Sequence, residues 1–219
     1  MVGSEVRLIE YSKRVDASNC ITHAAGAILS AAALIFMIIR TNGIGLRHTF
    51  SAVIFGLSMI AVYTVSAVYH GLPSGEAKRI ARLVDHSTVP VLIAGTATPC
   101  ALITLYDVSA FHCFTVLIIA WFCAIFGMIS KLFFFEKLKA VTMAVYIGSC
   151  AVMLFSVVPI LGEINGKAFA GILLGCLAYL IGAVLCFLGI KKEVFHVVFH
   201  IFVMIGNAIH LFIFAKYML

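Results

Sequence analysis

Long apolar stretches separated by short charged clusters dominate the pattern of this chain. Seven windows lack Lys, Arg, Asp and Glu, and each is long enough for a helix of about 20 residues to cross a bilayer. The windows are residues 17–39, 48–75, 86–106, 108–130, 140–162, 168–190 and 194–215. The second window runs into a loop, so its helix is expected to end near His70. Because helices satisfy their own backbone groups in lipid, the pattern predicts an all-α bundle of seven transmembrane helices.

The connections between these windows are short. Loops are expected at 41–47, 71–82, near Asp107, and at 131–139, 163–167 and 191–193. Residues 17–219 are therefore expected to form a single transmembrane domain. Residues 1–16 mix charged and apolar side chains and are interpreted as a short cytoplasmic segment, with an interfacial helix as one option. Proline is expected to kink or end helices at Pro90, Pro99 and Pro159.

Basic residues are distributed unevenly between the two sides of the predicted bundle. The side of the N-terminus holds eleven, namely Arg7, Lys13, Arg14, Lys78, Arg79, Arg82, Lys131, Lys137, Lys139, Lys191 and Lys192. The other side holds four, namely Arg40, Arg47, Lys167 and Lys216. Because cytoplasmic loops carry the excess of Lys and Arg, the N-terminus is predicted to be cytoplasmic and the C-terminus outside.

The composition supports a membrane as the solvent for most of the chain. Hydrophobic residues make up 63% and charged residues 11%, whereas soluble domains carry about 25% charged residues. The net charge of +6 is assigned to basic loops against the inner leaflet, so no nucleic-acid partner is expected. The seven cysteines include no CxxC pair and are interpreted as packing residues rather than metal ligands.

Polar and ionisable residues gather at the predicted cytoplasmic ends of four helices. Such residues are costly within a membrane and usually mark functional sites. They are Asn19 and His23 in the first helix, Ser66 and His70 in the second, Asp85 and His86 in the third, and His196 and His200 in the seventh.

A metal ion is the chemistry that this grouping favours. His196 and His200 are four residues apart and share a helix face, and one further histidine would complete the three-histidine set of a catalytic zinc site that leaves a fourth position for water. Asp85 is predicted to hold that water or act as a base, and Ser66 to support a ligand or an intermediate. Interfacial histidines and an interhelical hydrogen bond from Ser66 are the simpler alternatives. Three imidazoles also suit iron, copper or nickel.

Three further polar residues have no assigned role. His23 is interpreted either as a neighbour of the metal ligands or as an interfacial residue. Asn207 shares the face of His196 and His200, and with His210 it forms a polar stripe running deeper into the bundle. This stripe either lines a water-filled cavity or makes interhelical hydrogen bonds.

These motifs together resemble a known family. Ser66-Ala-Val-Tyr-His70, Asp85-His86-Ser87 followed by Gly95-Thr96-Ala97-Thr98-Pro99, His196-Val-Val-Phe-His200 and the early Asn19-Cys-Ile-Thr-His23 are similar to the signature of the hemolysin III proteins, the bacterial branch of the progestin and adipoQ receptor family. The resemblance implies a seven-helix fold with the topology opposite to that of G-protein-coupled receptors. It also implies zinc held by His70, His196 and His200, with Asp85 reaching it through water.

The resemblance implies a lipid-related function in a bacterial inner membrane. Adiponectin receptors of this family look like ceramide-hydrolysing enzymes, and bacterial members are associated with membrane homeostasis. The leading hypothesis is a zinc-dependent hydrolase that cleaves an amide or ester of a lipid entering from the bilayer. A membrane-state sensor with structural zinc is the second hypothesis, and a transporter or haemolytic pore is the third. The oligomeric state is not predicted.

Overall fold

Seven long helices make up almost the whole molecule. The computed structural model describes residue 6 and residues 8–218. Within this range, all seven helices are long and apolar enough to cross a membrane. They are α1 (Lys13–Thr41), α2 (Leu46–Gly71), α3 (Glu76–Pro99), α4 (Ala110–Phe133), α5 (Lys139–Ser156), α6 (Gly166–Leu188) and α7 (Val194–Ile213). The predicted number and type of elements are therefore confirmed.

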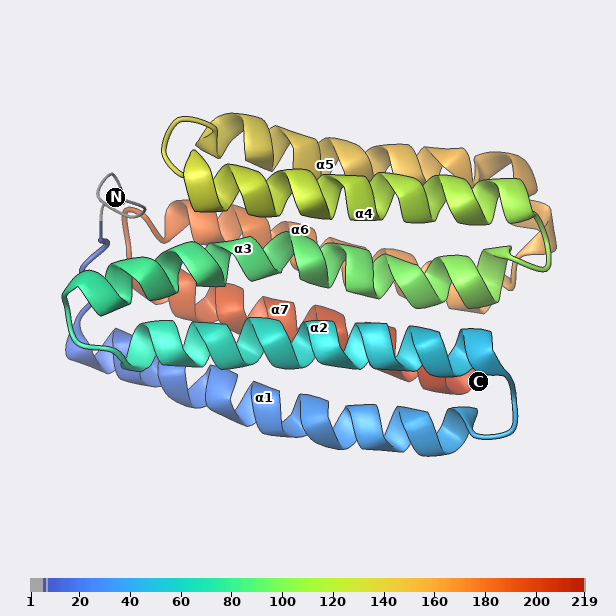
Figure 1. The fold of residues 1–219 in the computed structure, drawn as a ribbon, viewed down its shortest axis with the longest axis horizontal. Coiled ribbons are helices and arrows are strands. Elements are labelled where there is room, and N and C mark those ends of the chain that lie inside the picture. The colour runs from blue at the N-terminus through green and yellow to red at the C-terminus, as the bar shows by residue number, and fades with distance from the viewer. Residues whose placement is uncertain (1–5, 7, 219) are drawn as a thin grey trace.

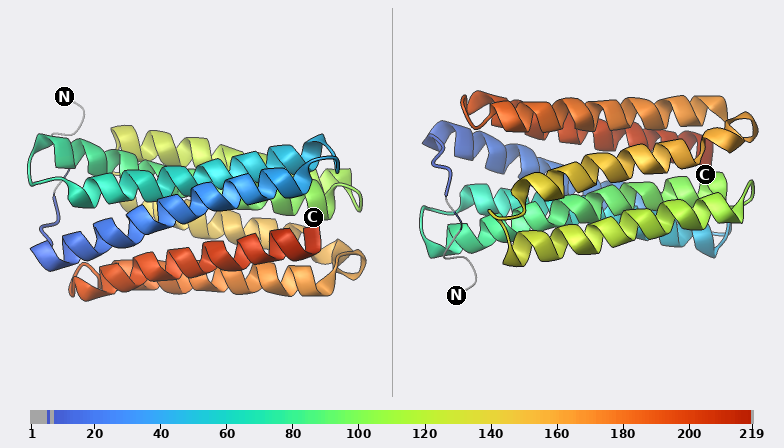
Figure 2. Two further views of the ribbon diagram at one scale, coloured as in Figure 1. Left: turned by 90° about the horizontal axis from the view of Figure 1, so that it is seen from below. Right: turned by 90° about the horizontal axis from the view of Figure 1, so that it is seen from above.

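The helices run roughly parallel to one long axis (Figure 1). Helices α1 to α5 pack in sequence order, α6 packs against α7, and α7 also contacts α1. Figure 2 shows α6 and α7 together along one side of the row that the earlier helices form. The start of α1 and the end of α7 lie at opposite ends of the bundle (Figure 1), as an odd number of spans requires.

The distribution of apolar and polar side chains suits a lipid solvent. Large apolar side chains lie on the outside, and Ile28, Phe111 and Phe155 are 72%, 75% and 74% exposed. Asn19 and Thr98, in contrast, are almost completely buried in the interior. Because hydrocarbon cannot hydrogen-bond to polar groups, this inward placement is what a membrane-spanning bundle requires.

Helix α3 begins earlier than the charge-free window at 86–106 indicates. Residues 71–82 were expected to form a loop, yet the helix already begins at Glu76. The expectation was wrong because charged side chains at the end of a spanning helix can lie in the interface while the backbone stays helical. Glu76 also suits a first turn, where the helix dipole favours a negative charge.

Helix α1 also begins before its window, at Lys13. The Ser12 side chain caps it by accepting a hydrogen bond from the Val15 backbone N–H at 3.4 Å. Residues 8–12 are not helical, so the interfacial helix considered for residues 1–16 does not form there, and residues 1–5 and 7 lie outside the described residues. The backbone N–H of Ser12 donates to the Glu193 carboxylate at 2.7 Å, which ties the start of α1 to the start of α7.

The three prolines that were expected to kink or end helices act differently. Pro90 lies inside α3 and the helix continues past it. Pro99 is the last residue of α3 and is followed by a π-helical segment, Cys100–Leu105. Pro159 lies at the start of a 3₁₀ turn, Val158–Glu163, just after α5 ends. The expected helix end is therefore confirmed at Pro159, where the ring cannot continue the α-helical hydrogen bonds.

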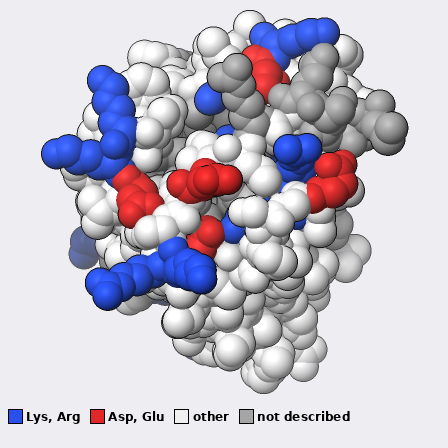
Figure 3. Space-filling model, turned by 90° about the vertical axis from the view of Figure 1, so that its left-hand side faces the viewer, with Lys and Arg blue, Asp and Glu red and all other residues white. Residues whose placement is uncertain are grey.

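Charged side chains gather at one end of the bundle, the end that holds the start of α1 and the α2–α3, α4–α5 and α6–α7 connections (Figure 3). Basic and acidic groups alternate there around an otherwise uncharged surface (Figure 3). We call this end the charged end. It is the end predicted to face the cytoplasm.

The orientation can be tested with reporters that function on only one side of a membrane. A periplasmic phosphatase fused after Leu219 is expected to be active, and a fluorescent protein that folds only in the cytoplasm is expected to be dark at the same position. The same two reporters inserted between Lys191 and Glu193 serve as the control and should show the opposite result. A fluorescent C-terminal fusion would contradict the predicted orientation.

Candidate metal centre

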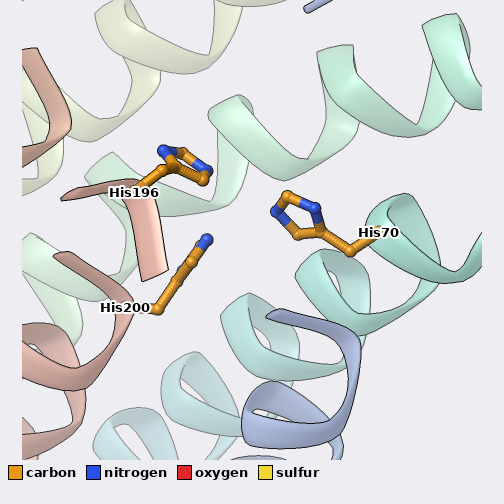
Figure 4. A group of neighbouring side chains, drawn as sticks. All are labelled: His70, His196 and His200. Atoms are coloured by element: carbon orange, nitrogen blue, oxygen red, sulfur yellow. The ribbon is translucent and has the colours of Figure 1, made fainter. Parts of the chain in front are cut away.

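Three histidines from two helices converge inside the bundle near the charged end. His70 is the second-last residue of α2, and His196 and His200 lie in the first two turns of α7. Their rings point toward one another (Figure 4), and one nitrogen of each lies within 4.8 Å of the others. All three are buried, at 3%, 8% and 3% exposure. The structure therefore brings together the three residues that the sequence grouped as metal ligands.

The nitrogen atoms of these rings fit a metal ion. Nε2 of His70 and both ring nitrogens of His200 are buried and have no hydrogen-bond partner among the described residues. Burying polar atoms without partners is costly, and neutral imidazole nitrogens are common ligands of zinc. A bound divalent ion would satisfy one nitrogen of each ring.

Asp16 orients His70 from outside the ligand set. Its Oδ1 atom lies 2.8 Å from His70 Nδ1, and its Oδ2 atom accepts a hydrogen bond from Lys78 Nζ at 2.7 Å. A carboxylate that accepts from a lysine ammonium offers acceptor oxygens, so the Nδ1–H of His70 donates to Asp16. Nε2 then carries the free lone pair and faces the other histidines. Carboxylates that fix metal-binding histidines in this way raise their basicity as ligands.

Sequence reasoning missed the role of Asp16. It assigned residue 16 to the N-terminal segment, whereas Asp16 lies in the first turn of α1. The spacing of Asp16, Asn19 and His23 is a signal that could have revealed it, because positions three and seven residues apart share a helix face. The Asn19 amide lies 3.5 Å from the same His70 Nδ1 atom.

His23 and Tyr11 surround the histidine group. The His23 ring lies edge-on to His200, with centroids 4.0 Å apart, and both His23 nitrogens are buried without partners among the described residues. Tyr11 stacks on His196 with centroids 4.9 Å apart. Burial raises the pKa of the Tyr11 phenol above its usual range, so the phenol stays protonated. His23 therefore lies beside the three-histidine group, as the first of its two interpretations states.

Asp85, Ser66 and His86 occupy different places. Asp85 is partly buried on α3 and lies outside the three-histidine group. The buried Ser66 hydroxyl lies near Asp85 but has no well-formed hydrogen bond within the described chain. His86 packs edge-on against Phe135 with centroids 5.1 Å apart. Asp85 and Ser66 are thus near enough to each other to act together, whereas His86 contacts a different part of the charged end.

The deeper polar stripe is a hydrogen-bonded network between helices. Asn207 on α7 donates to the Tyr63 hydroxyl on α2 at 2.5 Å and accepts from the Tyr179 hydroxyl on α6. The Tyr179 ring stacks on His210, and Tyr63 lies edge-on to His23. Of the two interpretations of Asn207, the interhelical hydrogen bond is the one found.

The backbones of α2 and α7 do not pack closely, although side chains of both helices, such as Tyr63 and Ile213, belong to one apolar cluster. Helix α7 packs mainly against α6 and α1, and α2 packs against α1 and α3. The side chains of the histidine group and the Asn207–Tyr63 hydrogen bond lie between α2 and α7. An ion held by His70, His196 and His200 would therefore join two parts of the bundle that backbone packing leaves separate.

Comparisons with known proteins agree with the motifs. A family model described as Haemolysin-III related matches residues 11–211. The chain is similar to "Hemolysin-3 homolog" of Bacillus subtilis (strain 168), at 33% identity over 199 residues, covering 90% of this chain and 92% of the relative. It is also similar to "Hemolysin-3" of Bacillus cereus, at 34% identity over 220 residues, covering 100% and 98%.

The role of Asp16 predicts a loss of metal affinity when its charge is removed. Asp16→Asn is expected to weaken zinc binding by about 10- to 100-fold, because His70 loses the carboxylate that orients it. Competition with a chelator of known affinity measures the change in purified protein.

Two further variants separate this effect from a general loss of stability. Glu10→Gln removes an exposed charge from the same segment and should leave the affinity unchanged. Asp16→Asn/Lys78→Met avoids an unpaired buried lysine and should still bind zinc weakly. Wild-type affinity in both Asp16 variants would show that Asp16 does not orient His70.

Proposed function

Because the chain belongs to the Haemolysin-III related family, we propose that it is a zinc-dependent hydrolase that cleaves an amide or ester bond of a membrane lipid. The observation that carries the proposal is the buried group of three imidazoles with unpartnered nitrogens, one of which, His70, is oriented by the Asp16 carboxylate. Three histidines with a free fourth position are typical of catalytic zinc, whereas structural zinc sites commonly have four protein ligands.

The residues divide into ligands and proton carriers. His70, His196 and His200 would hold the ion, and Asp16 would keep His70 in the tautomer that presents Nε2. When bound, zinc lowers the pKa of a water molecule to about 7 and polarises a carbonyl group. Binding the ion requires neutral histidines, so zinc binding should weaken as the pH falls.

Asp85 would move the proton during the reaction. Its carboxylate would accept a proton from the attacking water while the water oxygen forms a bond to the lipid carbonyl carbon. The carbon–nitrogen or carbon–oxygen bond would then break, and Asp85 would return the proton to the departing amine or alcohol. The Ser66 hydroxyl, buried beside Asp85, would donate a hydrogen bond to that carboxylate or to the developing oxyanion.

The setting of the site agrees with a lipid substrate. The group lies near the charged end of a bundle whose outer surface is apolar, so a lipid would approach from the bilayer. With the N-terminus in the cytoplasm, the site would serve the inner leaflet of a bacterial inner membrane and adjust its lipid composition.

A structural role for the metal is the second candidate. The observation in its favour is that α2 and α7 meet through side chains and not by close backbone packing, and the ion would link the two helices. In this case the protein would respond to the state of the membrane without turnover. The relatives' name suggests haemolysis, but the hydrogen-bonded network of Tyr63, Asn207 and Tyr179 lends a pore no support.

The metal site itself is tested by analysis of metal content. Detergent-purified wild-type protein is expected to contain about one zinc ion per chain, and His196→Ala/His200→Ala to contain almost none, since it keeps a single ligand. His112→Ala, which removes a histidine at the other end of the bundle, should retain the ion. Equal metal in all three proteins, or none in any, would refute the site.

Catalysis is tested by Asp85→Asn. This variant is expected to retain zinc but to hydrolyse lipid amides and esters at least about 100-fold more slowly, because it lacks the proton acceptor. Release of fatty acid from a panel of bilayer lipids measures the rate. If wild-type protein containing zinc releases none, and chelation lowers its unfolding temperature, the structural role is favoured instead.

A further inference from the structure

Two buried cations flank one aromatic ring at the charged end. Arg82 lies in the second turn of α3, and Lys131 in the last turn of α4. They are only 4% and 6% exposed. The Arg82 Cζ atom lies 5.1 Å, and the Lys131 Nζ atom 5.2 Å, from the centre of the Phe135 ring. Two neighbouring helices thus deliver like charges to one small region.

Neither cation has an ion-pair partner in the described part of the chain. The carboxylates of Asp85 and Glu136 are in their vicinity but not within ion-pair distance, and Lys139 adds further positive charge. Nη1 of Arg82 is buried without a hydrogen-bond partner. Lys78, one turn earlier on α3 and equally buried, is in contrast bound to Asp16. The contrast matters because a buried charge needs a counter-charge, and attraction to an aromatic ring compensates only part of the cost of desolvation.

The geometry points to an anion-binding site between α3 and α4 that takes the phosphate of a lipid headgroup. A guanidinium group offers a planar fork that matches two phosphate oxygens, and an ammonium group adds a third donor. Both side chains lie within two turns of a helix end, the depth at which a spanning bundle meets the headgroups. Basic pockets between spanning helices at this depth bind anionic headgroups.

The site has a fixed relation to the proposed reaction centre. Arg82 precedes Asp85 by three residues, so both lie on a similar side of α3. A lipid held by its phosphate here would have its ester bonds on the side of Asp85. Binding itself does not depend on zinc or on hydrolysis, so it can be measured whether or not the protein is an enzyme.

The test uses native mass spectrometry of the full-length protein in detergent, with dioctanoyl phosphatidylglycerol as the probe. Wild-type protein is expected to carry a bound lipid. Arg82→Gln and Lys131→Gln should each weaken binding about fivefold or more, the change that about one basic residue at a headgroup makes. The matched controls Arg79→Gln and Lys137→Gln remove exposed charges from the same end and should bind like wild type.

Charge-conserving variants keep the result interpretable if a glutamine variant folds poorly. Arg82→Lys and Lys131→Arg should retain most of the binding, with helix content checked by circular dichroism. Equal binding by wild type, Arg82→Gln and Lys131→Gln would overturn the proposal. Loss of binding in the two control variants to the same degree would also overturn it, because the attraction would then be general.

Two additional arms identify the anion. Dioctanoylglycerol, which lacks phosphate, should not bind in an Arg82-dependent way. Inorganic phosphate that matches the lipid in an Arg82-dependent manner would support the anion site with free phosphate as its ligand. Glu5 lies outside the described residues, so Glu5→Gln is included. If Glu5→Gln binds the lipid and the wild-type protein does not, the Glu5 carboxylate is the counter-ion of Arg82 and Lys131, and the proposal fails.

Discussion

The need to satisfy buried polar atoms without water governs this molecule. His70, His196 and His200 place imidazole nitrogens between α2 and α7, where Nε2 of His70 and both ring nitrogens of His200 have no hydrogen-bond partner among the described residues. In a soluble protein, water could enter and compensate, but hydrocarbon around a bundle cannot. The histidines therefore make sense as a set whose members share one partner, and a divalent ion has the charge and the ligand preference to be that partner.

The side chains around the three histidines also provide partners for buried polar atoms. Asp16 connects an imidazole ring and an ammonium group, since it accepts from His70 on one side and from Lys78 on the other. The hydrogen bond of Ser12 to Glu193 holds the start of α1 beside the start of α7. Helix α1 thereby contributes no ligand of the three-histidine group, yet it controls how one ligand is presented. Below the group, Asn207 links α7 to both α2 and α6 through two tyrosine hydroxyls. These hydrogen bonds add to the backbone packing of α6 against α7 and connect α7 to α2.

The charged end contains two unlike environments that are only a short distance apart along α3. Near α1, the buried lysine is neutralised by an aspartate. Near α4, Arg82 and Lys131 lie against Phe135 with no ion-pair partner in the described part of the chain. Asp85 follows Arg82 by three residues on α3 and is the carboxylate proposed here for proton transfer. A hydrolase of anionic lipids would use the environment near α1 to hold the metal ion and the environment near α4 to bind the lipid headgroup. A sensor would use the same two environments to couple metal binding to lipid binding.

The sequence by itself determined the seven helices, their order, and the convergence of Ser66, His70, Asp85, His196 and His200 on one end, because span length and helical spacing are local properties. It could not determine which polar side chains are partners, since partners such as Asp16 and Lys78 are far apart in the chain and meet only when α1, α2 and α3 pack. It also placed the start of α3 too late, because a window free of charged residues does not detect a helix that extends into the membrane interface.

Only the tertiary structure decided that His23 lies against His200, that Asn207 makes interhelical hydrogen bonds, and that Arg82 and Lys131 both lie against the Phe135 ring. Pairing across helices depends on their rotation and depth, and these are set by the packing of the whole bundle.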